Sequence, residues 1–182
     1  YSIGIGSFSN IGKTFSPTPL GKNNLYLGVE IGARCQLSCK HCIYVQELPN
    51  ASSPNPDVLN RVQQSVNKGL RPDWVTFPGR EPTLFPDDLS KMAGLFKSPG
   101  RRIILMTNAM NLDDDLASRL AESLDSFDIS IDGDEYGHDW MRGNGMFKRL
   151  FSRIAYLNEH CAPHIGLIAT AVHGNLPDGT PQ

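Results

Sequence analysis

Apolar residues along this chain alternate between short continuous runs and helical spacing, in units of about thirty residues, the size of a βα unit. The continuous apolar run at 103–106 predicts a buried strand, because a strand covered on both faces carries apolar residues at every position. Residues 74–77 and 127–131 also predict short strands. Residues 25–31 and 165–172 are also strand-like and bring the predicted set to five.

Stretches with apolar residues at every third or fourth position separate these strands and predict four amphipathic helices. The helices are expected to begin near Asn55, Pro86, Asp113 and Phe147. The acidic run 113–115 favours a helix N-terminus, where negative charge is stabilised, over a metal site. Strictly alternating strands and helices predict an α/β fold whose parallel sheet has right-handed crossovers.

Length limits how this sheet can close. A complete eight-fold α/β barrel takes about 250 residues, and this chain has 182. We therefore expect an open sheet or part of a barrel over residues 25–182, preceded by an N-terminal arm at 1–24 that is rich in Gly, Ser, Asn and Pro. Residues 174–182 add no sixth strand, so we expect the sequence to be part of a longer chain.

Net charge and the lengths of the apolar runs argue against two classes of partner, nucleic acids and membranes. A net charge of −2 gives no basic surplus for nucleic acid. No apolar run is long enough to cross a bilayer, and the first residues do not resemble a signal peptide. We expect a cytoplasmic protein, because its cysteines are clustered rather than spread as in a disulfide scaffold.

Three of the four cysteines lie in one short segment directly after the first predicted strand. Cys35, Cys39 and Cys42 form a C-x3-C-x2-C pattern, whereas Cys161 is far away in the sequence. A closed 4Fe–4S site has four cysteines, so three thiolates leave one iron open to a small ligand. The alternatives are structural zinc with His41 as a fourth ligand, or buried free thiols.

This spacing resembles the signature of the radical S-adenosylmethionine (radical SAM) enzymes. His41 stands where the family usually has an aromatic residue. After the second strand, Gly79-Arg80-Glu81-Pro82 is similar to the family's Gly-Gly-Glu-Pro turn, with Arg80 in place of the second glycine. The resemblance implies that Glu81 and the carbonyls around Gly79 and Arg80 hold the methionine amine.

Further motifs follow the next two strands in the same order as in the family. Thr107-Asn108 resembles part of Thr-Asn-Gly, and Ser130-Ile131-Asp132-Gly133 resembles Ser-Leu-Asp-Gly. The resemblance implies that Ser130 and Asp132 lie near the ribose or carboxylate of S-adenosylmethionine, with Thr107 and Asn108 adjacent. The pattern from His138-Asp139 to Arg142-Gly143 is common in the branch that modifies peptides and often carries a SPASM or twitch domain.

The resemblance implies a partial (βα)6 barrel, of which this chain holds about five units. It also implies a 4Fe–4S cluster on Cys35, Cys39 and Cys42 and S-adenosylmethionine as the second cofactor. Reductive cleavage of that molecule would yield a 5′-deoxyadenosyl radical that takes hydrogen from a substrate. We expect a peptide or protein substrate and an electron donor such as flavodoxin or ferredoxin. The alternatives are a small-molecule substrate (a sugar, nucleoside or amine) or a non-catalytic iron–sulfur or zinc module.

Overall fold

The computed structural model describes residues 25–44 and 56–170. The predicted arm at 1–24 and the residues after 170 lie outside this description. The described strands are β1 (Tyr26–Gly28), β2 (Trp74–Phe77), β3 (Arg102–Thr107), β4 (Ser126–Ser130) and β5 (His164–Ile168). The helical elements are α1 (Pro56–Asn67), the short 3-10 turn η2 (Pro82–Leu84), α2 (Pro86–Phe96), α3 (Asp114–Ala121), α4 (Glu135–Arg142) and α5 (Met146–His160).

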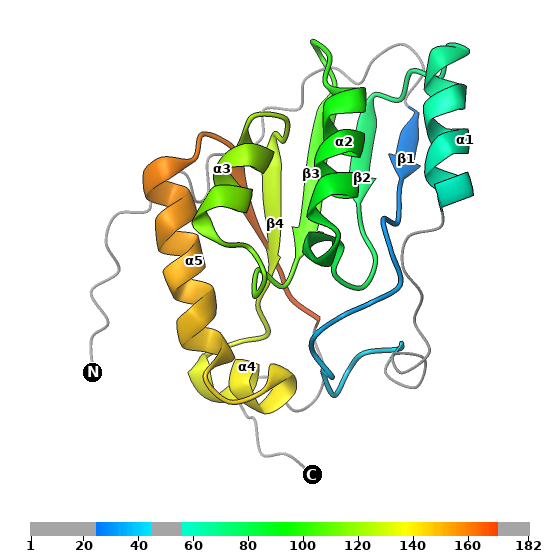
Figure 1. The fold of residues 1–182 in the computed structure, drawn as a ribbon. Coiled ribbons are helices and arrows are strands. Elements are labelled where there is room, and N and C mark those ends of the chain that lie inside the picture. The colour runs from blue at the N-terminus through cyan, green and yellow to red at the C-terminus, as the bar shows by residue number, and fades with distance from the viewer. Residues whose placement is uncertain (1–24, 45–55, 171–182) are drawn as a thin grey trace.

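The five strands form one parallel sheet in the order of the sequence, β1-β2-β3-β4-β5 (Figure 1). Every neighbouring pair is parallel, as in the register of Leu105 with Phe127. The predicted α/β fold of a partial barrel is confirmed. Strand β1 is shorter than predicted, although the Val29 N–H still donates to the Thr76 carbonyl at 2.9 Å.

Helices α2, α3 and α5 lie across the same face of the sheet (Figure 1). Alternate strand residues such as Val75, Leu105 and Phe127 are completely buried against them and form the hydrophobic core. The residues between them point to the opposite face, because successive strand side chains alternate. We call this the inner face, and its members in β2 to β5 include Thr76, Ile104, Met106, Ser126, Asp128, Ser130, Gly166 and Ile168.

Two helical elements differ from the pattern expected from the sequence. Helix α4 has eight residues. Its clearest sequence signal is the N-cap Asp134, whose carboxylate accepts from the Gly137 N–H at 2.8 Å. The turn η2 is a single turn capped by Glu81. Both are too short for apolar periodicity to reveal. Within the described parts of the chain, no helix combines the length and apolar character needed to cross a membrane.

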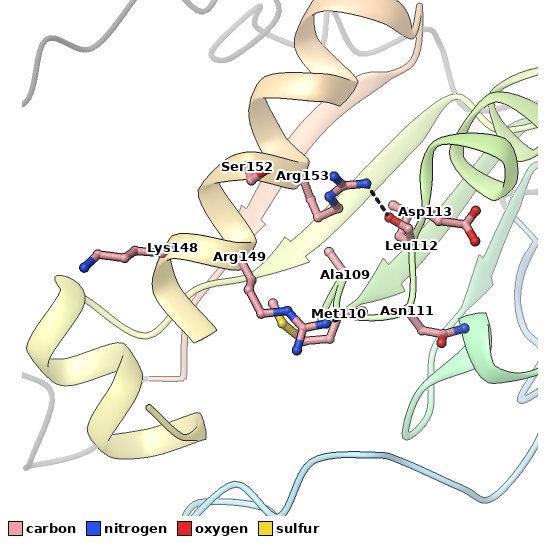
Figure 2. Close-up of a pocket in the computed structure, with 9 residues that line it drawn as sticks. All are labelled: Ala109, Met110, Asn111, Leu112, Asp113, Lys148, Arg149, Ser152 and Arg153. Carbon is pink, nitrogen blue, oxygen red and sulfur yellow. Dashed lines mark hydrogen bonds between the residues drawn. The ribbon is translucent and has the colours of Figure 1, made fainter. Parts of the chain in front are cut away.

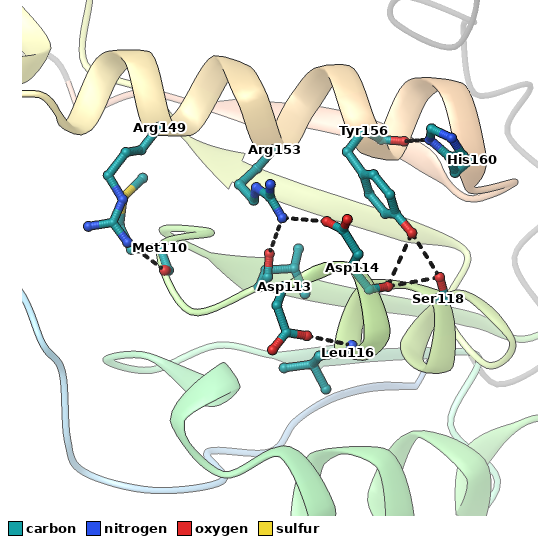
Figure 3. Close-up of polar contacts among 10 residues, drawn as sticks. Met110, Asp113, Asp114, Leu116, Ser118, Arg149, Arg153, Tyr156 and His160 are labelled. Atoms are coloured by element: carbon teal, nitrogen blue, oxygen red, sulfur yellow. Dashed lines mark hydrogen bonds and ion pairs between the residues drawn. The ribbon is translucent and has the colours of Figure 1, made fainter.

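Polar contacts fix α5 against α3 and the segment before it (Figure 3). The Arg153 guanidinium donates to the Asp114 carboxylate at 2.6 Å and to the Leu112 carbonyl at 3.3 Å. The Tyr156 hydroxyl donates to the Asp114 carbonyl at 3.3 Å and lies 3.2 Å from the Ser118 hydroxyl. These contacts hold the outer helices in place, so that the strand ends keep fixed positions.

The acidic run 113–115 gives a test of helix capping. The Asp113 carboxylate accepts from the Leu116 N–H at 2.8 Å and caps α3, whereas Asp115 is exposed within the first turn. Asp113→Ala should lower the free energy of unfolding by about 1 kcal/mol, because a backbone donor loses its acceptor. Asp115→Ala should stay within about 0.5 kcal/mol of the wild type. Urea unfolding measures both, and equal losses would contradict the assignment of Asp113 as the cap.

Candidate cofactor site

A pocket of about 380 Å³ lies at the carboxyl ends of the strands, where α/β folds bind ligands. The segment after β1 crosses below the sheet in Figure 1 toward α4 and supplies one wall. The turn after β2, the ends of β3 to β5 and the end of α4 supply the rest. The lining residues used below are Cys35, Cys39, His41, Cys42, Gly79, Arg80, Met106, Thr107, Asn108, Ser130, Arg142 and Ile168.

All three clustered cysteines line this pocket as free thiols. Burial raises the pKa of the Cys39 thiol to about 11, although nearby Arg142 acts in the opposite direction. Burial likewise raises the pKa of Cys35. Metal binding requires thiolates, so a bound metal would have to displace the protons from these two sulfurs.

Backbone hydrogen bonds hold the cysteine segment to two other parts of the chain. The Lys40 N–H donates to the Met141 carbonyl of α4 at 3.0 Å. On the other side, the Glu81 N–H donates to the Arg34 carbonyl at 3.1 Å, and the Arg80 guanidinium donates to the Ala33 carbonyl. The segment is therefore connected both to the turn after β2 and to α4.

The donor set fits a cluster with three cysteine ligands. The Cys35 sulfur already accepts from the Leu37 N–H at 3.4 Å and from Asn108 Nδ2 at 3.6 Å, and such contacts favour a negatively charged sulfur. Among the described residues, no three His, Cys, Asp or Glu side chains converge as a single-metal site does. A cluster needs no such convergence, because each thiolate binds a different iron.

The Glu81 carboxylate is buried at the ends of β2 and β3 and accepts four hydrogen bonds. Oε1 accepts from the Thr83 N–H at 3.1 Å, the Thr83 hydroxyl at 2.6 Å and the Thr107 hydroxyl at 2.7 Å. Oε2 accepts from the Asn108 N–H at 2.8 Å. Burial raises the pKa of this carboxyl, and these four contacts act in the opposite direction. Glu81 thus connects η2 to the end of β3.

The Asp132 carboxylate is a second buried acceptor, just after β4. Oδ2 accepts from Arg142 Nε at 2.5 Å and lies 3.9 Å from His41 Nε2. Oδ1 accepts from the Thr170 N–H at 3.2 Å. A buried carboxylate needs such partners, because an unpaired charge there is costly. Asp132 thereby connects α4 to the residues after β5, with the His41 ring of the cysteine segment close by.

Two histidine rings beside Asp132 each have one buried nitrogen that finds no hydrogen-bond partner among the described residues, His41 Nδ1 and His138 Nε2. The other nitrogen of His138 accepts from the Asp132 N–H at 3.2 Å. Burial lowers the pKa of both rings. His41 lines the pocket and presents a flat ring there, whereas His138 is buried behind the Asp132 backbone.

The residues expected to contact S-adenosylmethionine fall into two groups. Five of them line the pocket: Gly79, Arg80, Thr107, Asn108 and Ser130. The side chains of Glu81, Pro82 and Asp132 are buried behind that lining.

Arg142 belongs to the pocket wall although sequence reasoning gave it no role. Its position within the motif from His138 to Gly143 was the available signal. Lys40 and Trp140 are also paired near this wall, with the ammonium nitrogen 3.8 Å from the ring centroid.

Another pocket, of about 490 Å³, lies on the helix-covered side between the β3–α3 segment and α5 (Figure 2). Its basic side chains are already used in internal contacts. Arg149 donates to the Met110 carbonyl at 3.3 Å, and Arg153 pairs with Asp114. Lys148 extends away from the β3–α3 segment in Figure 2 and lies 3.3 Å from a Glu135 oxygen. Among the described residues, no cysteine or histidine lines this pocket.

Two curated relatives are similar to part of the chain. Molybdenum cofactor biosynthesis protein 1 of Homo sapiens is 27% identical over 123 residues, which cover 65% of this chain and 19% of that protein. Fe-coproporphyrin III synthase of Methanosarcina barkeri is 29% identical over 118 residues, which cover 60% of this chain and 28% of that protein. The chain thus spans less than a third of either relative.

A solved structure of native anSMEcpe with bound AdoMet and the Cp18Cys peptide has the same fold. The TM-score is 0.66 at 21% identity, over 80% of this chain and 42% of that one. Residues 29–178, well over half of the chain, match the model of the Radical SAM superfamily. Because this match includes the cysteine segment and every strand end that lines the pocket, the chain belongs to the radical SAM superfamily.

Proposed function

We propose that this chain is the core of an enzyme that cleaves S-adenosylmethionine reductively and uses the resulting radical to take hydrogen from a substrate. Family membership implies S-adenosylmethionine and a 4Fe–4S cluster as the cofactors. The observation that carries the proposal is the pocket itself, in which three free thiols face the polar ends of parallel strands. When bound and reduced, the cluster supplies the electron that breaks the sulfonium bond.

In this proposal, Cys35, Cys39 and Cys42 hold the irons. The Arg142 guanidinium and the Ser130 hydroxyl receive the methionine carboxylate, because both line the pocket and can donate to an anion. Asp132 orients Arg142 through their ion pair.

Carbonyls at Gly79 and Arg80 receive the methionine amine in this proposal. Gly79 has a φ of 110°, which a residue with a side chain rarely adopts, so its carbonyl direction depends on glycine. Glu81 then acts behind them as a positioning residue, since its carboxylate already accepts four hydrogen bonds.

The substrate and partners of the whole protein are also part of the proposal. A peptide substrate is supported by the motif from His138 to Gly143. A small molecule is the second candidate, because the curated relatives are named for molybdenum cofactor biosynthesis and Fe-coproporphyrin III synthesis. We further propose a cytoplasmic location and a flavodoxin or ferredoxin as electron donor.

Cysteine variants test the proposed function. After anaerobic reconstitution, the wild-type chain should form 5′-deoxyadenosine from S-adenosylmethionine and dithionite, as measured by mass spectrometry. Cys35→Ala, Cys39→Ala and Cys42→Ala should each reduce this product to background, because each removes an iron ligand. Cys161→Ala is the matched control, since Cys161 is buried at the end of α5, and it should keep the activity. No product from an iron-loaded wild-type chain would contradict the proposal.

Glu81→Gln tests the positioning role of Glu81. Whichever way the amide is turned, its NH2 group faces a backbone N–H, from Thr83 or from Asn108, and one donor loses its acceptor. The free energy of unfolding should fall by about 1–3 kcal/mol, the cost of an unsatisfied buried group.

Urea unfolding of the metal-free chain measures this loss without any contribution from cofactors. The control Glu122→Gln changes an exposed side chain and should stay within about 0.5 kcal/mol of the wild type. An unchanged stability of Glu81→Gln would show that the four hydrogen bonds do not hold the strand ends together.

A further inference from the structure

Asp128 places a carboxylate on the inner face of the sheet, in the middle of β4. It is partly exposed, and among the described residues it has one hydrogen bond, from the Ser126 hydroxyl at 2.6 Å, and no ion pair. A carboxylate can accept about four hydrogen bonds, so most of the capacity of Asp128 is unused within this part of the chain. Its neighbours across the sheet, Met106 and Gly166, carry no charge.

Gly166 provides the space for this carboxylate. A Cβ atom at Gly166 would lie 2.3 Å from Asp128 Oδ1, closer than real Cβ contacts, and 3.0 Å from its Cγ, a tight contact. The φ of Gly166 is not positive, so its backbone conformation does not require glycine. A glycine within a strand weakens the strand and often marks a close approach by a ligand or another chain segment. The Asp128 carboxylate therefore occupies the space next to Gly166 of β5 that a larger residue would fill.

The same carboxylate lies next to the cofactor pocket. Met106 pairs with Asp128 in the sheet and lines that pocket. Ser130 and Ile168 also line the pocket. They follow Asp128 and Gly166 by two residues on the same face of β4 and β5, about 7 Å further along each strand. Asp128 is thus a carboxylate on the inner face, beside Met106 of the pocket lining and one step below Ser130.

We propose that Asp128 recognises a positively charged nitrogen of the substrate, an ammonium or a guanidinium group. This inference rests on the proposed function and names the substrate class for the same site. A cation would complete the unused hydrogen-bonding capacity of the carboxylate, and charge-assisted hydrogen bonds in a partly buried site are strong and selective. Ser126 and the gap over Gly166 hold the carboxylate in position for that contact.

A purely structural role for Asp128 predicts different measurements from recognition. If Asp128 only accepts the hydrogen bond from Ser126, Asp128→Asn keeps an acceptor oxygen and should leave both the melting temperature and ligand binding unchanged. If the carboxylate serves a cation, the isosteric Asn should leave the melting temperature unchanged or higher and weaken binding, because functional charges often reduce stability. Asp115→Asn makes the same charge change at an exposed position of α3 and is the matched control.

The experiment measures probe binding by isothermal titration to the reconstituted chain with S-adenosylmethionine present and no reductant, so that no turnover occurs. The cationic probes are agmatine and Nα-acetyl-lysine amide, and the neutral counterpart is Nα,Nε-diacetyl-lysine amide. We expect at least one cation to bind the wild type and the Asp115→Asn control, and its dissociation constant to rise about tenfold or more in Asp128→Asn, as for a lost charged contact.

Gly166→Ala supplies a second variant, and it should also weaken cation binding because its Cβ displaces the carboxylate. The inference is overturned if neither cation binds the wild type more tightly than the neutral probe does. It is also overturned if Asp128→Asn binds the cations as tightly as the wild type. Failure of the proposed function is seen separately, as absence of 5′-deoxyadenosine in the wild type, since titration without reductant does not depend on cleavage.

Discussion

The buried carboxylate of Glu81 is the contact on which the rest of the site depends. Parallel strands end side by side, but nothing in the sheet itself fixes the loops that follow them. The four hydrogen bonds to Glu81 join the turn after β2 to the end of β3. The Glu81 N–H and the Arg80 side chain then hold the cysteine segment through Arg34 and Ala33. Because the four hydrogen bonds to the Glu81 carboxylate lie away from water, removing one leaves a buried group without a partner.

Asp132 has the corresponding place on the other side of the pocket. It joins α4 to the residues after β5 through Arg142 and Thr170, and the His41 ring of the cysteine segment lies 3.9 Å away. The two carboxylates thus fix opposite walls of the pocket. Their internal contacts also orient donors that line the pocket, such as the Arg142 guanidinium. In this arrangement the protein positions groups, and the cofactors supply the reactivity.

Much of the fold could be predicted because its signals are local. Continuous apolar runs such as 103–106 mark strands, and the cysteine spacing marks the loop after β1. Helix α4 could not be predicted from periodicity, since it makes only about two turns. The burial of Glu81 and the opposition of Asp128 to Gly166 depend on which residues become neighbours across the sheet. Sequence spacing does not contain that register, so these features emerge only from the structure.

The central claim is that the three cysteines bind a cluster whose open iron takes up S-adenosylmethionine. Electron paramagnetic resonance of the reduced, reconstituted chain, recorded with and without S-adenosylmethionine, tests it most directly. The account predicts a reduced 4Fe–4S signal whose g-values change when S-adenosylmethionine is added, because its ligand set changes. An identical spectrum in both samples, or tight zinc binding without iron uptake, would contradict it.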